Sequence, residues 1–209
     1  HGSTTDLCVD RHARGHDAVL QVSKVIEPGD TLWLRVRDRD LNRDSALVEH
    51  GMVTLQVGDS TLDHWLDAVD PALDSYDGTV SSSSNTTGFG ALQVTPGDWV
   101  IVSYLDTAAA AGDFIIRTDT SIVIERFGDA DGNGLLQAFD ANVILRHVVQ
   151  PALSGADSLA ANVDSLAPMS AVTPLDAAML LQQRVGLRSR FPVQLRSSVN
   201  HPGPYLVAT

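Results

Sequence analysis

Residues 129–140 read Asp129-Ala130-Asp131-Gly132-Asn133-Gly134-Leu135-Leu136-Gln137-Ala138-Phe139-Asp140. The spacing of the acidic and amide side chains matches the twelve-residue calcium loop, in which oxygen donors at alternating positions surround one ion. Gly134 stands where such a loop turns sharply, and Asp140 stands where its last ligand begins a helix. An acidic turn that only caps a helix would not require all these features. The ligands expected for this first Ca²⁺ are Asp129, Asp131, Asn133, the backbone carbonyl of Leu135, Gln137 and Asp140.

This loop and the helix after it have a second copy further along the chain. Phe139-Asp140-Ala141 matches Leu175-Asp176-Ala177 at an offset of 36 residues, and apolar residues recur at helical spacing in 139–149 and in 175–185. Neither short helix can bury an apolar face alone, so the repeat predicts that the two helices pack against each other.

The loop before the second helix fits the calcium pattern less well. It is about three residues too long, and it lacks the Asp and Gly expected at positions 5 and 6. Two interpretations stay open: a second Ca²⁺, or a loop without an ion that Pro168, Pro174 and packing hold in place. The oxygen donors available for a second Ca²⁺ are Asn162, Asp164, Thr173 and Asp176.

The first half of the chain has the pattern of an antiparallel β domain. Short apolar runs alternate with turn signals, and Pro28-Gly29-Asp30 and Pro96-Gly97-Asp98 each predict a type II turn. The Ser- and Thr-rich stretch 80–88 is expected to be an exposed loop. We therefore predict an all-β immunoglobulin-like sandwich, whose clearest strands are 19–26, 31–37, 53–57, 62–69, 91–94 and 99–105.

Charge and motifs exclude several classes of function. The net charge is −12, and residues 125–209 hold seven Asp/Glu and six Arg, so nearly all the excess acidity lies in residues 1–124. That charge disfavours nucleic acid and membrane partners. The sequence has no G-x-S-x-G or HExxH motif and a single cysteine, Cys8, so we expect no enzyme active site, zinc site or internal disulfide.

Gly128-Asp129-Ala-Asp131-Gly-Asn133-Gly134, followed by a helix and then by Val172-Thr-Pro-Leu-Asp176-Ala-Ala-Met-Leu-Leu, resembles a bacterial dockerin across about residues 124–193. Dockerins are paired calcium-binding repeats that attach secreted proteins to cohesin modules. The resemblance implies a small all-α, EF-hand-type pair, a cohesin partner and an extracellular or cell-surface location. It also implies a partner-binding face made of Ala138, Phe139, Val143, Arg146, Pro174, Leu175, Met179 and Gln182, although each of these residues has ordinary core packing as an alternative role.

Pro28-Gly-Asp30-Thr-Leu and Leu92-Gln-Val-Thr-Pro96-Gly-Asp98 resemble immunoglobulin-like repeats of bacterial surface proteins. A β module directly before a dockerin is also the arrangement of X-module–dockerin pairs. The expected organisation is therefore a leading segment with an expression remnant (1–17), the β-sandwich (18–123), the dockerin-like domain (124–193) and a tail (194–209).

Three further hypotheses compete with calcium-dependent docking. The chain could be a structural or adhesive surface fragment whose helical part only stabilises its end. Oxygen donors at alternating positions could hold another Ca²⁺, although a solvated turn balanced by neighbouring arginines is the preferred explanation for them: Asp38, Asp40, Asn42 and Asp44. A carbohydrate-binding sandwich would require a planar row of exposed aromatics, for which the candidates are Trp33, Trp65, Trp99 and Tyr104.

Overall fold

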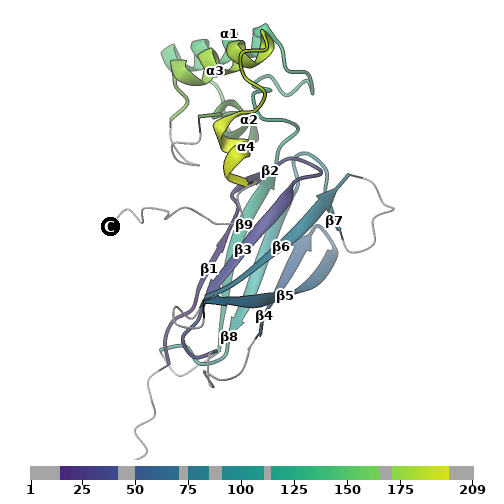
Figure 1. Cartoon of the computed structure of the whole chain (residues 1–209), viewed down its shortest axis with the longest axis vertical. Helices are drawn as coiled ribbons and strands as arrows, with labels where there is room; N and C mark the ends of the chain where they lie inside the picture. The colour runs from purple at the N-terminus through teal and green to yellow at the C-terminus, as the bar shows by residue number, and fades with distance from the viewer. Residues whose placement is uncertain are drawn as a thin grey trace, which may run out of the picture.

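The computed structural model describes residues 15–41, 50–70, 75–84, 91–110, 114–164 and 171–197. In this part of the chain a long β-sheet carries a cluster of short helices at one end (Figure 1). The strands are β1 (Val19–Val22), β2 (Val25–Ile26), β3 (Thr31–Arg37), β4 (His50–Val57), β5 (Ser60–Asp70), β6 (Ser75–Ser83), β7 (Leu92–Gln93), β8 (Trp99–Asp106) and β9 (Ile115–Val123). The helices are α1 (Ala138–Val149), α2 (Gly155–Ala161), α3 (Pro174–Arg184) and α4 (Pro192–Ser197).

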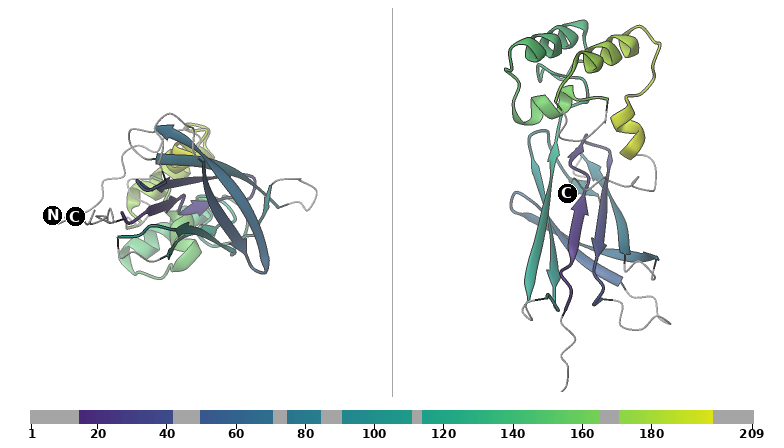
Figure 2. Two further views of the ribbon diagram at one scale, coloured as in Figure 1. Left: turned by 90° about the horizontal axis from the view of Figure 1, so that it is seen from below. Right: turned by 90° about the vertical axis from the view of Figure 1, so that its left-hand side faces the viewer.

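The β part is one curled sheet, so the prediction of a two-sheet immunoglobulin-like sandwich was wrong. Its strand order is β1-β3-β6-β5-β4-β8-β9-β2, with β7 paired to β6. The eleven-residue strand β5 pairs with β4 along one edge and with β6 along the other, so the ladder never divides into two sheets. A register shift between Ala68 and Asp70 marks a bulge in β5, and bulges bend a strand. The curl brings β1 against β9 (Figure 2, left).

The alternation that the sequence showed does place side chains on the two faces of the sheet. In β3, Leu32, Leu34 and Val36 are buried, whereas Arg37 is exposed. Both Pro-Gly turns also form as predicted: Gly29 and Gly97 have positive φ, and Asp30 N donates to Glu27 O across the first turn.

Two strands of the sheet were not among the clearest strands that the sequence indicated. β6 includes residues 80–83, which were expected to belong to an exposed loop, and residues 85–90 of that loop lie outside the described residues. The buried Ser82 hydroxyl has hydrogen-bond partners: it donates to Asp30 O (2.7 Å) and accepts from Gly29 N (3.2 Å). The hydrogen bonds of this polar segment therefore come from residues distant in sequence, and no apolar run signals the strand. β9 is the second of these strands.

The C-terminal part is a cap of short helices (residues 124–197), and the prediction of a helical EF-hand pair was wrong. β9, and not a helix, leads into the first loop, and the seven-residue helix α2 precedes the second. No helix enters the first loop, because residues 115–123 form strand β9 and Gly128, directly before the loop, has a positive φ that ends any regular structure there. What the cap keeps is a loop followed by a helix, twice, with α1 packed against α3.

Two hydrophobic cores meet where the sheet joins the cap. In β2, Ile26 is buried in the sheet core, whereas its neighbour Val25 packs against the cap core. At the end of β9, Val123 belongs to the sheet core and Ile124 to the cap core. Alternating side chains of the same two strands thus contribute to both cores. In the described residues, no helix has the length and apolarity needed to cross a membrane.

Candidate metal centre and docking surface

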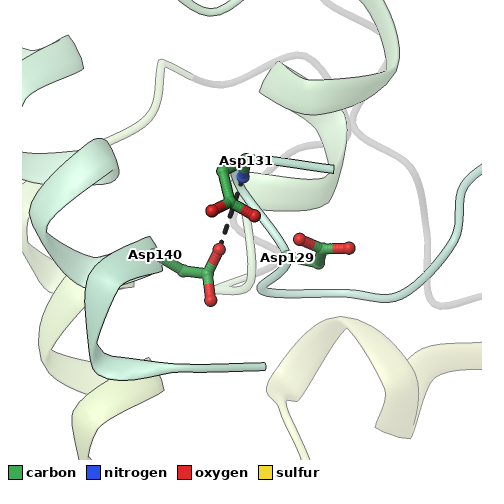
Figure 3. Close-up of side chains that lie close together, drawn as sticks. All are labelled: Asp129, Asp131 and Asp140. Atoms are coloured by element: carbon green, nitrogen blue, oxygen red, sulfur yellow. Dashed lines mark hydrogen bonds between the residues drawn. The ribbon is translucent and has the colours of Figure 1, made fainter. Parts of the chain in front are cut away.

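Three carboxylates of the first loop converge at the start of α1 (Figure 3). Asp129, Asp131 and Asp140 each present an oxygen, and these oxygens lie within 4.8 Å of one another. Asp129 and Asp140 are buried, and Asp131 is exposed. Calcium takes oxygen ligands at about 2.3–2.6 Å, so two ligands on opposite sides of one ion lie roughly 5 Å apart. The separation of the three oxygens fits one Ca²⁺.

Backbone N–H groups of the loop hold Asp129 in place. Gly134 N donates to its Oδ2 at 2.7 Å, and Asn133 N donates to its Oδ1 at 3.1 Å. Gly134 has φ of 78°, a conformation that residues with side chains rarely adopt, and it lets the loop turn back toward Asp129. The glycine at position 6 therefore acts as the sequence predicted.

Asp140 joins the loop to the first turn of α1. Its Oδ1 accepts from Ala130 N at 3.0 Å and from Asp131 N at 3.3 Å, the bond drawn in Figure 3. Its Oδ2 accepts from Gln137 N at 2.7 Å. A carboxylate in a first helical turn also suits the helix dipole. Asp140 therefore fixes the shape of the loop and offers its charge to a ligand.

The first loop carries more negative charge than its protein contacts balance. In the described residues, no Lys or Arg forms an ion pair with Asp129, Asp131 or Asp140. Glu125 lies beside Gly134 and Asp157 beside Gly132, which adds further acids. Burial raises the pKa of Asp129, and the neighbouring Asp131 and Asp140 raise it further, because each favours the neutral form. Hard oxygen donors with excess charge fit a divalent cation.

The other residues expected in the first site lie around the three carboxylates. Asn133 Nδ2 donates to Asp131 at 2.8 Å, and its Oδ1 accepts from Leu135 N at 2.8 Å. Gln137 precedes α1 and contacts Asp140 through its backbone. The Leu135 side chain is exposed, so only the backbone of this residue is available to the site. The structure brings Asp129, Asp131 and Asp140 together as the residues that would hold Ca²⁺, and Asn133, the Leu135 carbonyl and Gln137 stay predicted ligands.

The second loop repeats the hydrogen bonds of the first. Asp176 Oδ1 accepts from Val163 N at 2.9 Å and from Asp164 N at 3.0 Å, and its Oδ2 accepts from Thr173 N at 2.8 Å. Asp176 thus matches Asp140, and Asp164 matches Asp131. The offset is 33 residues at the start of the loop and 36 at its end, which places the three extra residues inside it.

Of the donors predicted for a second ion, Asn162, Asp164 and Asp176 are buried. The Thr173 hydroxyl caps α3, since it accepts from Leu175 N at 3.2 Å and donates to Asp176 Oδ2 at 3.0 Å. Residues 165–170 of this loop lie outside the described part of the chain. A second Ca²⁺ therefore stays a prediction.

The residues predicted to bind a partner divide into two groups. Val143 and Met179 are half-buried and pack against the cap core. Phe139 and Leu175 are 53% and 46% exposed, although each is a large apolar side chain. The remaining four, which are also exposed, are Ala138, Arg146, Pro174 and Gln182.

Sequence reasoning missed further apolar residues on the surface of α1 and α3. Leu145 and Leu181 are exposed, as are Val149 and Val185, which end or follow the two helices. Each pair is separated by the same 36 residues as Phe139 and Leu175, so the repeat offset would have revealed them. Phe139 and Leu145 are six residues apart and therefore lie about 120° apart around α1, so these residues are not all on one side of the two helices. We use the name docking face for these six exposed apolar residues: Phe139, Leu145, Val149, Leu175, Leu181 and Val185.

In the acidic turn after β3, the carboxylates of Asp38 and Asp40 accept hydrogen bonds from protein groups and need no ion to balance them. Buried Asp38 accepts from Tyr104 Oη at 2.5 Å and from Asp40 N at 2.9 Å. Burial and this bond to Asp38 raise the pKa of Tyr104, so its hydroxyl keeps its proton and remains a donor. Asp40 in turn accepts from His16 N. Asn42 and Asp44 lie outside the described residues.

The four aromatic residues considered for carbohydrate binding do not share one surface. Trp65 and Trp99 are exposed on β5 and β8, whereas Tyr104 points into the sheet core. Trp33 on β3 lies under the Arg35 guanidinium, 4.8 Å from its ring centre. These positions give no planar row of aromatics.

The outer face of the sheet instead carries aliphatic neighbours of Trp65. Met52 in β4 pairs with Trp65 in β5, and Leu105 in β8 pairs with Ile116 in β9. All four side chains are exposed. Val53 in β4 pairs with Tyr104 in β8, which places the neighbouring Met52 next to Leu105. They form an apolar row across four adjacent strands.

Comparison with known proteins assigns this chain to no family. It matches no protein-family model, and no curated protein is significantly similar to it. A function for the chain must therefore be inferred from its two loops and from the exposed surfaces of its helices and sheet.

Proposed function

We propose that this chain is a calcium-dependent docking module that attaches its parent secreted protein to a cohesin-bearing partner at the cell surface or outside the cell. The observation that carries the proposal is the cluster of Asp129, Asp131 and Asp140 at the start of α1. The matching hydrogen bonds of Asp176 at the start of α3 support it, because they give both helices the same kind of anchor.

A bound Ca²⁺ would supply the positive charge that the first loop lacks. Asp129 comes from the beginning of the loop and Asp140 from α1, so ligation of one ion by both would tie the loop to the helix. α1 and α3 have twelve and eleven residues, and helices of this length are marginal without tertiary contacts. Ion binding is expected to supply part of the folding free energy of the cap, and chelation to loosen it.

The docking face supports a protein partner. α1 and α3 lie at the end of the molecule away from the sheet, and α2 and α4 lie between them and the sheet (Figures 1 and 2). The half-buried Val143 and Met179 pack against the cap core, whereas the exposed apolar residues of the docking face are available to a partner. Matched apolar residues on two packed helices are typical of a protein interaction surface.

The loop-and-helix resemblance to dockerins favours a cohesin as that partner. The resemblance concerns the two loops with the helix that follows each, and it does not extend to an EF-hand pair. The excess acidity of residues 1–124 further disfavours nucleic acid and anionic membrane as partners. The site also offers no arrangement that we interpret as catalytic.

Calorimetric titration with cohesin modules encoded in the same genome tests the proposal. We expect one-to-one binding in calcium that is lost in EDTA and in Asp129→Ala and Asp140→Ala. Asp59→Ala, which removes an acid from the turn between β4 and β5, is the control and should bind normally. Calcium-stabilised protein that binds none of these cohesins would overturn the proposal.

The second candidate function is a structural or adhesive surface fragment. The exposed apolar row on the outer face of the sheet favours it, because large exposed apolar side chains are typical of adhesion surfaces. Cohesin binding that depends on the docking face, and not on Trp65 and Met52, would separate the two functions.

A further inference from the structure

A carboxylate of the sheet contacts both ends of the cap. Glu27 lies between β2 and β3, and its Oε1 accepts from Phe127 N at 2.7 Å and from Gln194 Nε2 at 3.2 Å. Phe127 stands two residues before Asp129, the first ligand expected for Ca²⁺. Gln194 belongs to α4. One oxygen atom of the sheet therefore binds the entrance of the calcium loop and the last described helix.

Gln194 extends this contact to the residue next to Asp129. Its own Oε1 accepts from Phe191 N at 3.0 Å, which fixes the start of α4. Phe191 is fully buried and packs against Gly128: a side-chain carbon at 128 would lie 3.0 Å from Phe191 Cζ and 2.6 Å from Leu136 Cδ1. Gly128 N also donates to Ala160 O at 2.7 Å. The backbone just before Asp129 is therefore enclosed from several sides.

Burial and the nearby Asp30 disfavour the ionised form of the Glu27 carboxylate. Burial raises its pKa, and Asp30 in the same turn raises it further, whereas Phe127 N, Gln194 and Arg126 lower it. Asp30 also accepts from Glu27 N at 3.2 Å. A partly buried acid is normally disfavoured unless hydrogen bonds compensate it, and here both side-chain bonds come from the cap.

We propose that Glu27 is the positioning residue of the calcium loop. It binds Phe127 and, through Gln194 and Phe191, encloses Gly128, so that Asp129 is already in place when the ion arrives. The calcium part of this proposal rests on the proposed function. A loop held in its binding geometry loses less conformational freedom on ligation, and loss of residues that orient metal ligands typically costs about ten- to a hundredfold in affinity.

Three variants test the proposal. Glu27→Ala removes the acceptor, whereas Glu27→Gln keeps an amide oxygen that can accept both bonds. Asp77→Ala is the matched control, because it removes a part-buried carboxylate that bonds Arg35 within the sheet and is remote from the cap. Calcium affinity is measured by calorimetry, and amide hydrogen exchange is measured in EDTA.

We expect Glu27→Ala to weaken calcium binding about tenfold and to speed exchange at the loop amides of Ala130, Asn133 and Gly134. Glu27→Gln should restore both to near the wild-type values, and Asp77→Ala should leave both unchanged. Unchanged exchange at the β4–β8 ladder shows that the sheet of each variant remains folded. Wild-type loop exchange in Glu27→Ala would overturn the proposal.

The two measurements separate this proposal from the proposed function. Wild-type protein that binds no calcium would remove the calcium-dependent function and, with it, the role of Glu27 in ion binding. The exchange measured in EDTA would still decide whether Glu27 positions the loop.

Discussion

Asp140 and Asp176 occupy equivalent places in the two halves of the cap. Each side chain is fully buried and accepts two backbone N–H bonds at Oδ1 and one at Oδ2. In each half the donors are two successive residues at the start of the loop and the residue that caps the following helix. One carboxylate therefore closes each loop onto its helix.

Replacement of Asp140 by Asn should weaken calcium binding by roughly two orders of magnitude, because affinity in such loops depends on the number of charged ligands. Asn has nearly the same size, but its amide nitrogen cannot accept a backbone N–H bond, so the loop loses both charge and one acceptor. Calorimetry measures the effect. Asp59→Asn, which removes an exposed acid from the turn between β4 and β5, is the control and should bind calcium normally. Equal affinities for the two variants would contradict the prediction.

Replacement of Asp176 by Ala should lower the free energy of unfolding by about 2–4 kcal/mol in EDTA, because three backbone N–H groups lose their acceptor. Urea denaturation monitored by circular dichroism measures this loss. Calcium binding at the first loop should persist in the folded variant. A change below about 0.5 kcal/mol, the usual effect of a surface substitution, would show that the hydrogen bonds of Asp176 are dispensable.

Single replacements of Phe139 and Leu175 by Ser should each reduce affinity for a cohesin at least about fivefold, since apolar anchors of an interface commonly contribute more than 1 kcal/mol. Both side chains are about half exposed, so calcium affinity and thermal stability should change little. Trp99→Ser removes an exposed aromatic of the sheet and is the control. Cohesin affinity that depends on Trp99 and not on Phe139 would place the interface on the sheet.

Glu27 should make stability fall as pH rises. Burial raises its pKa above the ordinary value of 4.5, so the folded protein holds this proton more tightly than the unfolded chain does. The cost of ionising Glu27 is absent below pH 4.5 and complete above its folded pKa. Relative to Glu27→Gln, which stays neutral, the wild type should lose unfolding free energy across that window. Urea denaturation in EDTA from pH 4 to 8 measures the unfolding free energy of both proteins. The same pH dependence in the wild type and in Glu27→Gln would contradict the prediction.

Replacement of Tyr104 by Phe should cost about 1.5–3 kcal/mol of unfolding free energy, because buried Asp38 loses a short hydrogen bond from the hydroxyl. Urea denaturation measures the change, and calcium affinity should be unaltered because Tyr104 belongs to the sheet core. Thr118→Ala, at an exposed position of β9, is the control. Equal stability of the two variants would show that Asp38 does not need this donor.

Local patterns predicted the candidate site better than they predicted the fold. The residues of the first loop lie within twelve positions, so their spacing alone indicates that Asp129, Asp131 and Asp140 converge. The same reasoning placed the starts of α1 and α3 and found the 36-residue repeat. It wrongly extended the resemblance to a whole EF-hand pair, because strand β9, and not a helix, leads into the first loop.

The sequence by itself determined what short-range geometry controls: the first loop, the helix that follows each loop, the Pro-Gly turns and the alternation of β3. Only the tertiary structure decided that β5 joins β4 to β6 in one curled sheet, and that one face of β6, including the polar Ser82, is buried. It also decided that Glu27 binds Phe127, 100 residues away. The physical reason is that periodicity and turn chemistry act over a few residues, whereas strand pairing and buried hydrogen bonds depend on which distant segments meet.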